Sequence, residues 1–343
     1  MRSLSFSKHT SIFKTPGGTS RGVLSTKDSW ILRLTDSASQ GITGIGEVSV
    51  IEGLSMDLPG KMEEMLNWLV KHINLPQVEI AQQLSDFPAI RFGLECSEID
   101  LAAGGKQFLF DTPFTRGEAP IPINGLIWMG NFDEMRIRII EKLNEGYRCI
   151  KIKVGAIDFE QELELIRKIR SEFSADEIEI RVDANGGFTP ENAAHRLEQL
   201  ARYALHSIEQ PIRQHQYAEM AKLCALNILP IALDEELIGV HNLDDRKMLL
   251  DTIQPQYIIL KPSLVGGFKD SDEWIRLATE RNIGWWATSA LETNIGLNAI
   301  AQWTSSHNVI LPQGLGTGQL FSNNFESHLE IRKGELWATG ASI

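Results

Sequence analysis

A (β/α)₈ barrel joined to a smaller α+β domain is the fold that this sequence predicts, and two observations carry the prediction. Six short apolar runs in the second half of the chain each end at a polar residue, and from Lys153 onward these ends recur at steps of 30, 26, 25, 27 and 28 residues. One strand, one helix and two loops need about that length. The second observation is size, because a barrel takes about 250 residues and the chain has 343.

Residues 1–117 are predicted to form the smaller α+β domain. The first 50 residues contain three strand-like runs, separated by the turn segments PGGTSRG and DSASQGITG: SFSKHTSIF, GVLSTKDSWILRLTDS and GIGEVSVIE. The periodicity then becomes helical in KMEEMLNWLVKHI and again in FPAIRFGLECSEIDLAAGG. Strands followed by helices are typical of an α+β module.

Residues 118–317 are predicted to form the barrel. IPINGLIW is expected to be its first strand and NVILPQGLGTG its eighth strand and loop, with helical segments such as EMRIRIIEKLNEGY and ENAAHRLEQLARYA alternating with strands between them. The helix after the second of the polar strand ends begins at Thr189-Pro190, a capping residue followed by a first-turn proline. The tail, residues 318–343, is expected to return to the first domain.

Composition excludes several classes of function. A formal net charge of −12 and a pI near 5.2 argue against a nucleic-acid partner, which needs a basic face. The three cysteines show neither a disulfide framework nor metal-ligand spacing, so a reducing compartment is expected. The polar start lacks a signal-peptide core, and no apolar run approaches the length of a membrane span. We expect a cytoplasmic protein; composition leaves its oligomeric state, including a homo-oligomer, open.

Three carboxylates end successive predicted strands: Asp183, Glu209 and Asp234. Neighbouring strands lie about 4.8 Å apart, so these strand ends can converge on one ion at the C-terminal face of a barrel. Three carboxylates with water suit a hard octahedral cation such as Mg²⁺. A single strand-end acid is as readily a helix cap or a solvated group, but three at matched spacing favour a metal site.

Two lysines precede these acids and one follows them. Lys151 and Lys153 alternate with apolar residues in CIKIKVG, so both side chains are predicted to face the barrel interior. Two like charges held close, with a divalent cation nearby, lower a lysine's pKa and make it a usable base. Lys261, after YIIL, lies across the barrel from Lys153 by strand count. Surface lysines on an edge strand or before a helix are the simpler alternative.

Weaker signals surround this set. Asn185, in DANGGF, is placed to hydrogen-bond into the site, whereas Glu235 would point away from it on a regular strand and act behind Asp234. The glycines of QGLGTG, including Gly314 and Gly316, expose backbone N–H groups that suit an anion.

The order Lys-x-Lys, Asp, Glu, Asp, Lys on successive strands resembles the enolase superfamily, in its muconate-lactonizing-enzyme subgroup. The segments SALETNIGLNAIAQW (289–303) and LPQGLGTGQLFSNN (311–324) resemble the o-succinylbenzoate synthases of menaquinone biosynthesis, and Arg181 suits that group. Dipeptide epimerases of the subgroup often carry Asp-x-Asp after the eighth strand. Here that place reads Gly314-Leu-Gly316, with no acid for a substrate ammonium.

The resemblance implies a modified TIM-like barrel with a capping domain built from residues 1–117 and the tail 318–343. It implies Mg²⁺, replaceable by Mn²⁺, on Asp183, Glu209 and Asp234. The implied lyase reaction is syn dehydration of 2-succinyl-6-hydroxy-2,4-cyclohexadiene-1-carboxylate to 2-succinylbenzoate, through proton abstraction next to a carboxylate and a metal-stabilised ene-diolate.

The resemblance also implies a role for each lysine. Lys153 would remove the proton and return it to the departing hydroxyl, Lys151 would help to lower the pKa of Lys153, and Lys261 would stabilise the anion on the other face. Ser289 and the backbone of Gly314 and Gly316 are candidates for holding the succinyl carboxylate of this small-molecule substrate.

A loop in the first domain is the predicted lid. It comprises residues 17–21, including Thr19 and Arg21, and is expected to close over the site. Several alternatives stay open: an N-acylamino acid racemase, a dipeptide epimerase or a muconate-type cycloisomerase would use the same lysines, and a metal-binding barrel without activity belongs to a different class.

Overall fold

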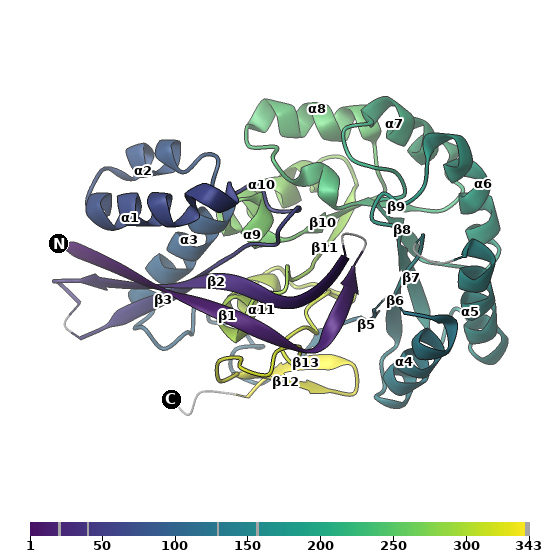
Figure 1. The fold of residues 1–343 in the computed structure, drawn as a ribbon, viewed down its shortest axis with the longest axis horizontal. Helices are drawn as coiled ribbons and strands as arrows, with labels where there is room; N and C mark the ends of the chain where they lie inside the picture. The colour runs from purple at the N-terminus through teal and green to yellow at the C-terminus, as the bar shows by residue number, and fades with distance from the viewer. Residues whose placement is uncertain (20–21, 40, 129, 156–157, 340–343) are drawn as a thin grey trace.

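The computed structural model describes residues 1–19, 22–39, 41–128, 130–155 and 158–339. Its N-terminal part is a three-stranded antiparallel sheet packed on three helices (Figure 1). The sheet order is β1 (Arg2–Thr19), β2 (Gly22–Asp36) and β3 (Thr43–Ser49). The helices are α1 (Met62–His72), α2 (Gln77–Gln83) and α3 (Pro88–Ala102), and a 3₁₀ turn, η1 (Pro59–Lys61), precedes α1. This architecture confirms the predicted α+β module.

The sheet and α3 approach closely because glycines line their contact. A Cβ atom at Gly46 would lie only 1.9 Å from the carbonyl oxygen of Gly93, so no other residue fits there without moving the backbone. Around this contact, strand residues such as Leu32 and Leu34 and helix residues such as Leu66 and Leu69 form a fully buried apolar core. The first domain therefore has a core of its own.

Seven parallel strands form the second sheet, in the order β11-β10-β9-β8-β7-β6-β5. Their bounds are β5 (Gly125–Ile127), β6 (Cys149–Lys153), β7 (Glu179–Asp183), β8 (Ser207–Glu209), β9 (Ile231–Leu233), β10 (Tyr257–Leu260) and β11 (Gly284–Ala287). The alternating helices are α4 (Phe132–Asn144), α5 (Phe159–Glu172), α6 (Pro190–Ala201), α7 (Tyr217–Leu226), α8 (Leu243–Ile253), α9 (Pro262–Val265), α10 (Phe268–Thr279) and α11 (Asn294–Ser305). Figure 1 shows α4 to α8 along the outside of the sheet.

The eighth barrel position holds no regular strand among the described residues. The predicted eighth strand instead makes two isolated parallel bridges, Ile123 to Gln313 and Thr288 to Gly314, which connect the segment before β5 with the segment after β11. The predicted first strand is also divided. Ile121–Pro122 (β4) pairs with β13 (Glu335–Ala338), which pairs in turn with β12 (Leu329–Arg332) in a separate antiparallel sheet, and only β5 joins the barrel.

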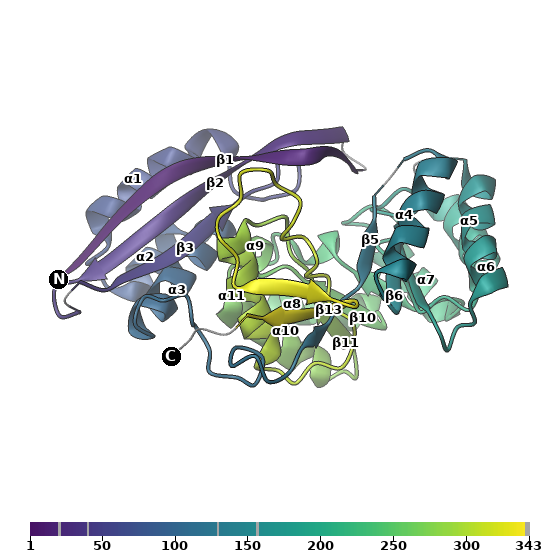
Figure 2. The same ribbon diagram turned by 90° about the horizontal axis from the view of Figure 1, so that it is seen from below.

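The tail therefore touches both parts of the molecule. Phe321 bridges Phe13 of β1, and Ser322 N donates to the carbonyl of Ile12 at 2.8 Å, before the chain runs on to β12 and β13. Figure 2 shows the long β1–β2 hairpin extending from the first domain toward the barrel strands, with β12 and β13 below it.

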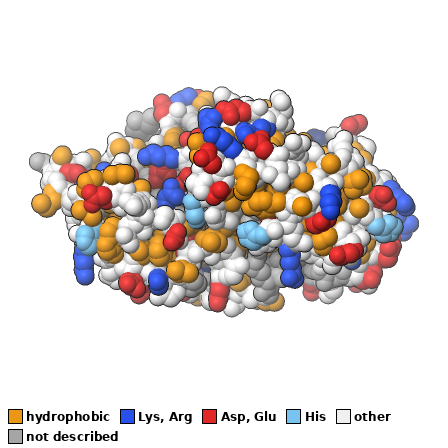
Figure 3. All heavy atoms as spheres, turned by 90° about the horizontal axis from the view of Figure 1, so that it is seen from above, with side chains coloured by type: hydrophobic (Ala, Val, Ile, Leu, Met, Phe, Trp, Pro, Cys, Tyr) orange, Lys and Arg blue, Asp and Glu red, His pale blue; other side chains and the backbone are white. Residues whose placement is uncertain are grey.

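The surface mixes both signs of charge. In Figure 3 acidic and basic side chains are interspersed over the visible face rather than gathered by sign. No helix in the described part of the chain is long and apolar enough to span a membrane.

Candidate active site

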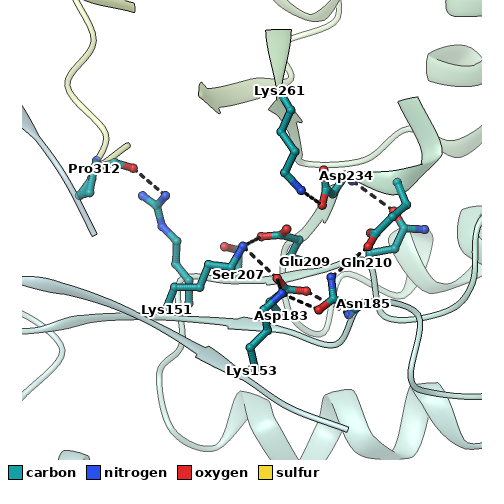
Figure 4. A network of polar contacts seen from close by, with 12 residues as sticks. Lys151, Lys153, Asp183, Asn185, Ser207, Glu209, Gln210, Asp234, Lys261 and Pro312 are labelled. Carbon is teal, nitrogen blue, oxygen red and sulfur yellow. Dashed lines mark hydrogen bonds and ion pairs between the residues drawn. The ribbon is translucent and has the colours of Figure 1, made fainter. Parts of the chain in front are cut away.

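The predicted strand ends lie side by side in the barrel sheet. The ladder pairs Lys153 with Asp183, and Asp183 with Glu209, so three neighbouring strands end at one level. On the next strand Glu209 pairs with Ala232, and β9 ends at Leu233, which places Asp234 just beyond that strand. Figure 4 shows all four side chains pointing into one region at the carboxyl ends of the strands, as a barrel active site requires.

Both lysines of Lys-x-Lys face this region. Lys151 Nζ lies 2.9 Å from Asp183 Oδ2 and also bonds Glu209 Oε2, while Lys153 Nζ lies 2.6 Å from the same Asp183 oxygen. The shared partner confirms the prediction that residues two apart on β6 point the same way. The exposed edge-strand alternative is wrong for Lys151, which is 7% exposed.

Lys261 enters from the other side of the site. Its ammonium bonds Asp234 Oδ2, and β10, which precedes it, stands four places from β6 in the sheet. Figure 4 shows Lys261 and Lys153 reaching the carboxylates from opposite directions. A flat substrate between them would therefore meet one ammonium group on each face.

Burial and neighbouring charges compete at these groups. Burial alone would lower the pKa of Lys151 and Lys261, but the carboxylates around them outweigh it and raise both pKa values. The expectation that a neighbouring ammonium and a divalent cation make Lys153 a usable base stays a prediction. Burial likewise opposes ionisation of Asp183, yet Lys151 and Lys153 hold its pKa well below the ordinary value.

Glu209 is the exception among the acids. Burial, followed by repulsion from Asp183 and Asp234, raises the pKa of Glu209 to about 8 despite Lys151. Its Oε1 atom is buried and has no hydrogen-bond partner in the described structure. A buried carboxylate oxygen without a partner is costly, and it fits a ligand position for a cation.

As they stand, no three acidic, histidine or cysteine side chains within the described ranges are grouped closely enough to surround one metal ion. The lysine ammonium groups lie between the acids instead. The donor set of three buried carboxylates on adjacent strand ends nevertheless suits Mg²⁺ by its chemistry, and the unpartnered oxygen of Glu209 is consistent with it.

Asn185 and Glu235 form a chain of hydrogen bonds that starts at Lys153. Asn185 Oδ1 accepts from Lys153 Nζ at 2.5 Å, and Asn185 Nδ2 donates to Glu235 Oε1 at 2.9 Å. Glu235 was expected to point away on a regular strand. It points back instead because the strand has already ended and Glu235 opens the 3₁₀ turn η2 (Glu235–Leu237).

Arg181 lies lower in the barrel interior, two residues before Asp183 on β7. Its guanidinium pairs with Glu179 at 2.6 Å, donates to the carbonyl of Pro312 at 2.8 Å and stacks over the Trp286 ring. Arg181 therefore joins β7 to the segment that completes the barrel, and it does not bond the strand-end carboxylates.

Ser289 meets the glycine loop after the barrel. Its hydroxyl lies 2.6 Å from that of Thr317, and its N–H donates to the carbonyl of Gly314. One expectation fails here: the N–H of Gly314 donates to the carbonyl of Ala287 at 2.8 Å, so it is not available to an anion. Gly314 is needed for close packing, because a Cβ there would lie 2.5 Å from Thr288 Oγ1. Gly316 remains a candidate.

The predicted lid is the end of the β1–β2 hairpin. Gly17 packs against the Trp128 ring just after β5, at a place where an added Cβ would lie 3.1 Å from a ring carbon. Thr19 is the last residue of β1, and Arg21 lies outside the described residues.

Two residues of the site escaped the sequence argument. Gln210 accepts from Asp234 N and donates to Glu236, and these two hydrogen bonds connect the end of β8 with the end of β9. The second residue is Thr317, whose hydroxyl bonds that of Ser289. The position of Gln210 directly after a strand-end acid was a usable signal, as was the place of Thr317 inside the glycine loop.

The comparisons agree with this geometry. Residues 134–341 match a family model described as enolase C-terminal domain-like. The chain is 49% identical to an o-succinylbenzoate synthase from Desulfotalea psychrophila over 97% of this chain and 98% of the relative. The chain therefore belongs to the enolase superfamily and, within it, to the family of o-succinylbenzoate synthases.

Solved structures show the same fold. The crystal structure of MenC from Desulfotalea psychrophila superposes with a TM-score of 0.87 at 45% identity, covering 98% of this chain and 99% of that one. A Bacillus subtilis L-Ala-D/L-Glu epimerase covers 98% of this chain and 95% of its own with a TM-score of 0.83 at 20% identity, which supports the fold alone.

Proposed function

We propose that this protein dehydrates 2-succinyl-6-hydroxy-2,4-cyclohexadiene-1-carboxylate to 2-succinylbenzoate and water. The observation that carries the proposal is the 49% identity, over nearly the whole chain, to an o-succinylbenzoate synthase. The complete set of opposed lysines and strand-end carboxylates supports it, since the reaction removes a proton next to a carboxylate.

Asp183, Glu209 and Asp234 would hold Mg²⁺, or Mn²⁺ in its place. When bound there, the cation supplies positive charge that stabilises the substrate carboxylate as negative charge develops on it. Lys151, which bonds Asp183 and Glu209, would hold both carboxyl groups in position beside Lys153.

Lys153 would act as the acid–base group. As a neutral amine it takes the proton from ring carbon 1, and the electron pair of that C–H bond first delocalises into the adjacent carboxylate. The pair then forms the double bond to carbon 6. The carbon–oxygen bond at carbon 6 breaks, and the same ammonium returns its proton to the departing hydroxyl, so water leaves. Asn185 would orient Lys153 for both transfers, because it accepts a hydrogen bond from Nζ.

Other residues would contact the opposite face of the substrate and its succinyl group. Lys261 would stabilise the flat anion electrostatically and through cation–π contact. The Ser289 hydroxyl and the backbone of Gly316 would hold the succinyl carboxylate, while Thr19 and Arg21 of the hairpin end would close over it.

Turnover of the purified protein tests the proposal. We expect the absorbance of the cyclohexadiene to disappear as 2-succinylbenzoate forms, and Lys153→Ala to abolish this. The wild-type protein should also be incubated with N-succinyl amino acids of both configurations in deuterated water, as alternative substrates. Efficient deuterium exchange into both enantiomers with negligible dehydration would show a racemase instead, using Lys153 and Lys261 on opposite faces.

A further inference from the structure

A fully buried acid of the capping domain bonds the start of the last barrel helix, four residues after the candidate site residue Ser289. Glu47, on β3, accepts from Thr293 N at 3.0 Å, from Thr293 Oγ1 at 2.6 Å and from Gly296 N at 2.9 Å. These donors form the start of α11. From the other side, Ser29 Oγ donates to Glu47 at 2.8 Å. A carboxylate 246 residues away in sequence thus caps a barrel helix.

A second buried acid bonds the loop that leads into this helix. Glu292 accepts from Ala290 N at 2.7 Å and from Ser263 Oγ at 2.5 Å, and Ser263 lies two residues after Lys261. Lys27 of the capping domain is also buried, and its ammonium, which bonds Ser49, attracts both acids electrostatically. Buried acids are stable only where a nearby cation and several hydrogen-bond donors compensate their charge, and this group of residues supplies both.

The loop between these two acids is strained. Leu291 has a φ of +59°, in the left-handed region that a leucine disfavours. Such a conformation persists only where the surroundings hold it in place. Here Glu292 accepts a hydrogen bond from Ala290 N, before Leu291, and Glu47 accepts one from Thr293 N, after it. The side chain of Leu291 packs with Phe13 of the β1–β2 hairpin and with Phe321.

Gly296 shows how tightly the arrangement is packed. A Cβ there would lie 2.9 Å from Glu47 Oε2 and 2.8 Å from two carbons of Glu292. The absence of a side chain at this position is what allows both acids to reach the first turn of α11.

We propose that Glu47 is a positioning residue for the loop of residues 288–293. Glu47 holds this loop in its strained form together with Glu292, and the loop in turn presents Ser289 to the substrate and Leu291 to the hairpin. The capping domain thus sets the substrate-binding geometry of the barrel through one carboxylate. The inference rests on the proposed function in one respect, because it takes Ser289 as a substrate contact.

Glu47→Gln is the direct test, and Glu95→Gln is its matched control. Glu95 is also an acid of the capping domain that accepts from the start of a barrel helix, from Phe268 N at 2.6 Å and Lys269 N at 3.2 Å, but it does not contact the loop of residues 288–293. Glutamine keeps the shape of either side chain and puts an amide donor where one carboxylate oxygen accepts. Four quantities are measured in each variant: kcat and KM for the cyclohexadiene, the Kd of 2-succinylbenzoate, and the rate of hydrogen exchange of residues 289–296.

We expect Glu47→Gln to raise KM and the Kd of 2-succinylbenzoate by about tenfold, the effect of losing charge-assisted hydrogen bonds. The kcat should stay within about threefold, because the lysines are not touched. Amides of residues 289–296 should exchange faster in this variant. Glu95→Gln should leave all four quantities within about twofold of wild type.

Equal effects of the two variants, or a loss of kcat with unchanged KM in Glu47→Gln, would overturn the inference. If Glu47→Gln does not fold, Thr293→Val removes one donor to the same carboxylate. It should raise KM about threefold, and an unchanged KM there refutes the positioning role. A wild-type protein that leaves the cyclohexadiene untouched refutes the proposed function instead, while the difference in hydrogen exchange between the two glutamine variants still decides the positioning role.

Discussion

Replacing Asp57 by asparagine should make the protein more stable, and increasingly so as the pH rises. Asp57 is 1% exposed and accepts from Ala89 N at the start of α3, at 3.1 and 3.3 Å. Burial raises the pKa of Asp57 from 3.8 to about 7, and the backbone N–H groups offset only part of this. Ionisation of Asp57 therefore lowers the free energy of unfolding of the protein.

The sign and size follow from proton linkage. Below pH 3.8 the carboxyl is protonated in both states; as the pH rises toward about 7, the unfolded chain releases this proton and the folded chain keeps it. The contribution of Asp57 to stability is thus complete below pH 3.8 and is lost as the pH rises through 7. Each pH unit corresponds to about 1.4 kcal/mol, so the full loss is about 4 kcal/mol.

Urea unfolding of wild type and Asp57→Asn at pH 5, 6, 7 and 8 measures this effect, because other titrating groups cancel in the difference. Asparagine keeps a side-chain oxygen for Ala89 N. The control is Asp158→Asn, which changes an exposed acid that caps α5 through Gln161 N and should not make the protein more stable. A difference between Asp57→Asn and wild type that stays flat, within about 1 kcal/mol, from pH 5 to 8 would refute the reasoning.

Three further predictions concern activity. Lys153→Ala should lose at least about 10²–10⁴ in kcat, measured as disappearance of the cyclohexadiene, and retention of a tenth of the rate would exclude Lys153 as the base. Removal of divalent cations by a chelator should abolish turnover and Mg²⁺ or Mn²⁺ should restore it, so full activity of metal-free enzyme would contradict the assignment to Asp183, Glu209 and Asp234. Arg21→Ala should change KM more than kcat, and kinetic constants all within about twofold of wild type would show that the hairpin end is not a lid.

The barrel was predictable where the sequence is periodic. Strand ends such as Lys153, Asp183 and Lys261 recur at the length of one βα unit, and apolar runs before them identify buried parallel strands. The convergence of these lysines and acids on one region of the barrel followed from the same register. The MenC comparison, at a TM-score of 0.87, bears out the fold.

The sequence could not show where a strand ends or which long-range bonds a backbone group makes. Glu235 faces Asn185 only because the chain turns after Leu233, and the N–H of Gly314 is taken by Ala287 across the barrel closure. Both depend on neighbours distant in the chain. The left-handed Leu291 is likewise invisible, since leucine gives no local signal for that conformation.

The bond between Glu47 and α11 has a consequence for synthesis of the protein. The capping strands leave the ribosome first, and Thr293 and Gly296 follow almost 250 residues later; at about 5–20 residues per second, that interval is tens of seconds or less. During this time Glu47 lacks three of its four donors and must stay hydrated, because a buried carboxylate without partners is unfavourable. The donors on α11 therefore reach Glu47 only after most of the chain has been made, so the contact between β3 and α11 is among the last that the capping strands can form.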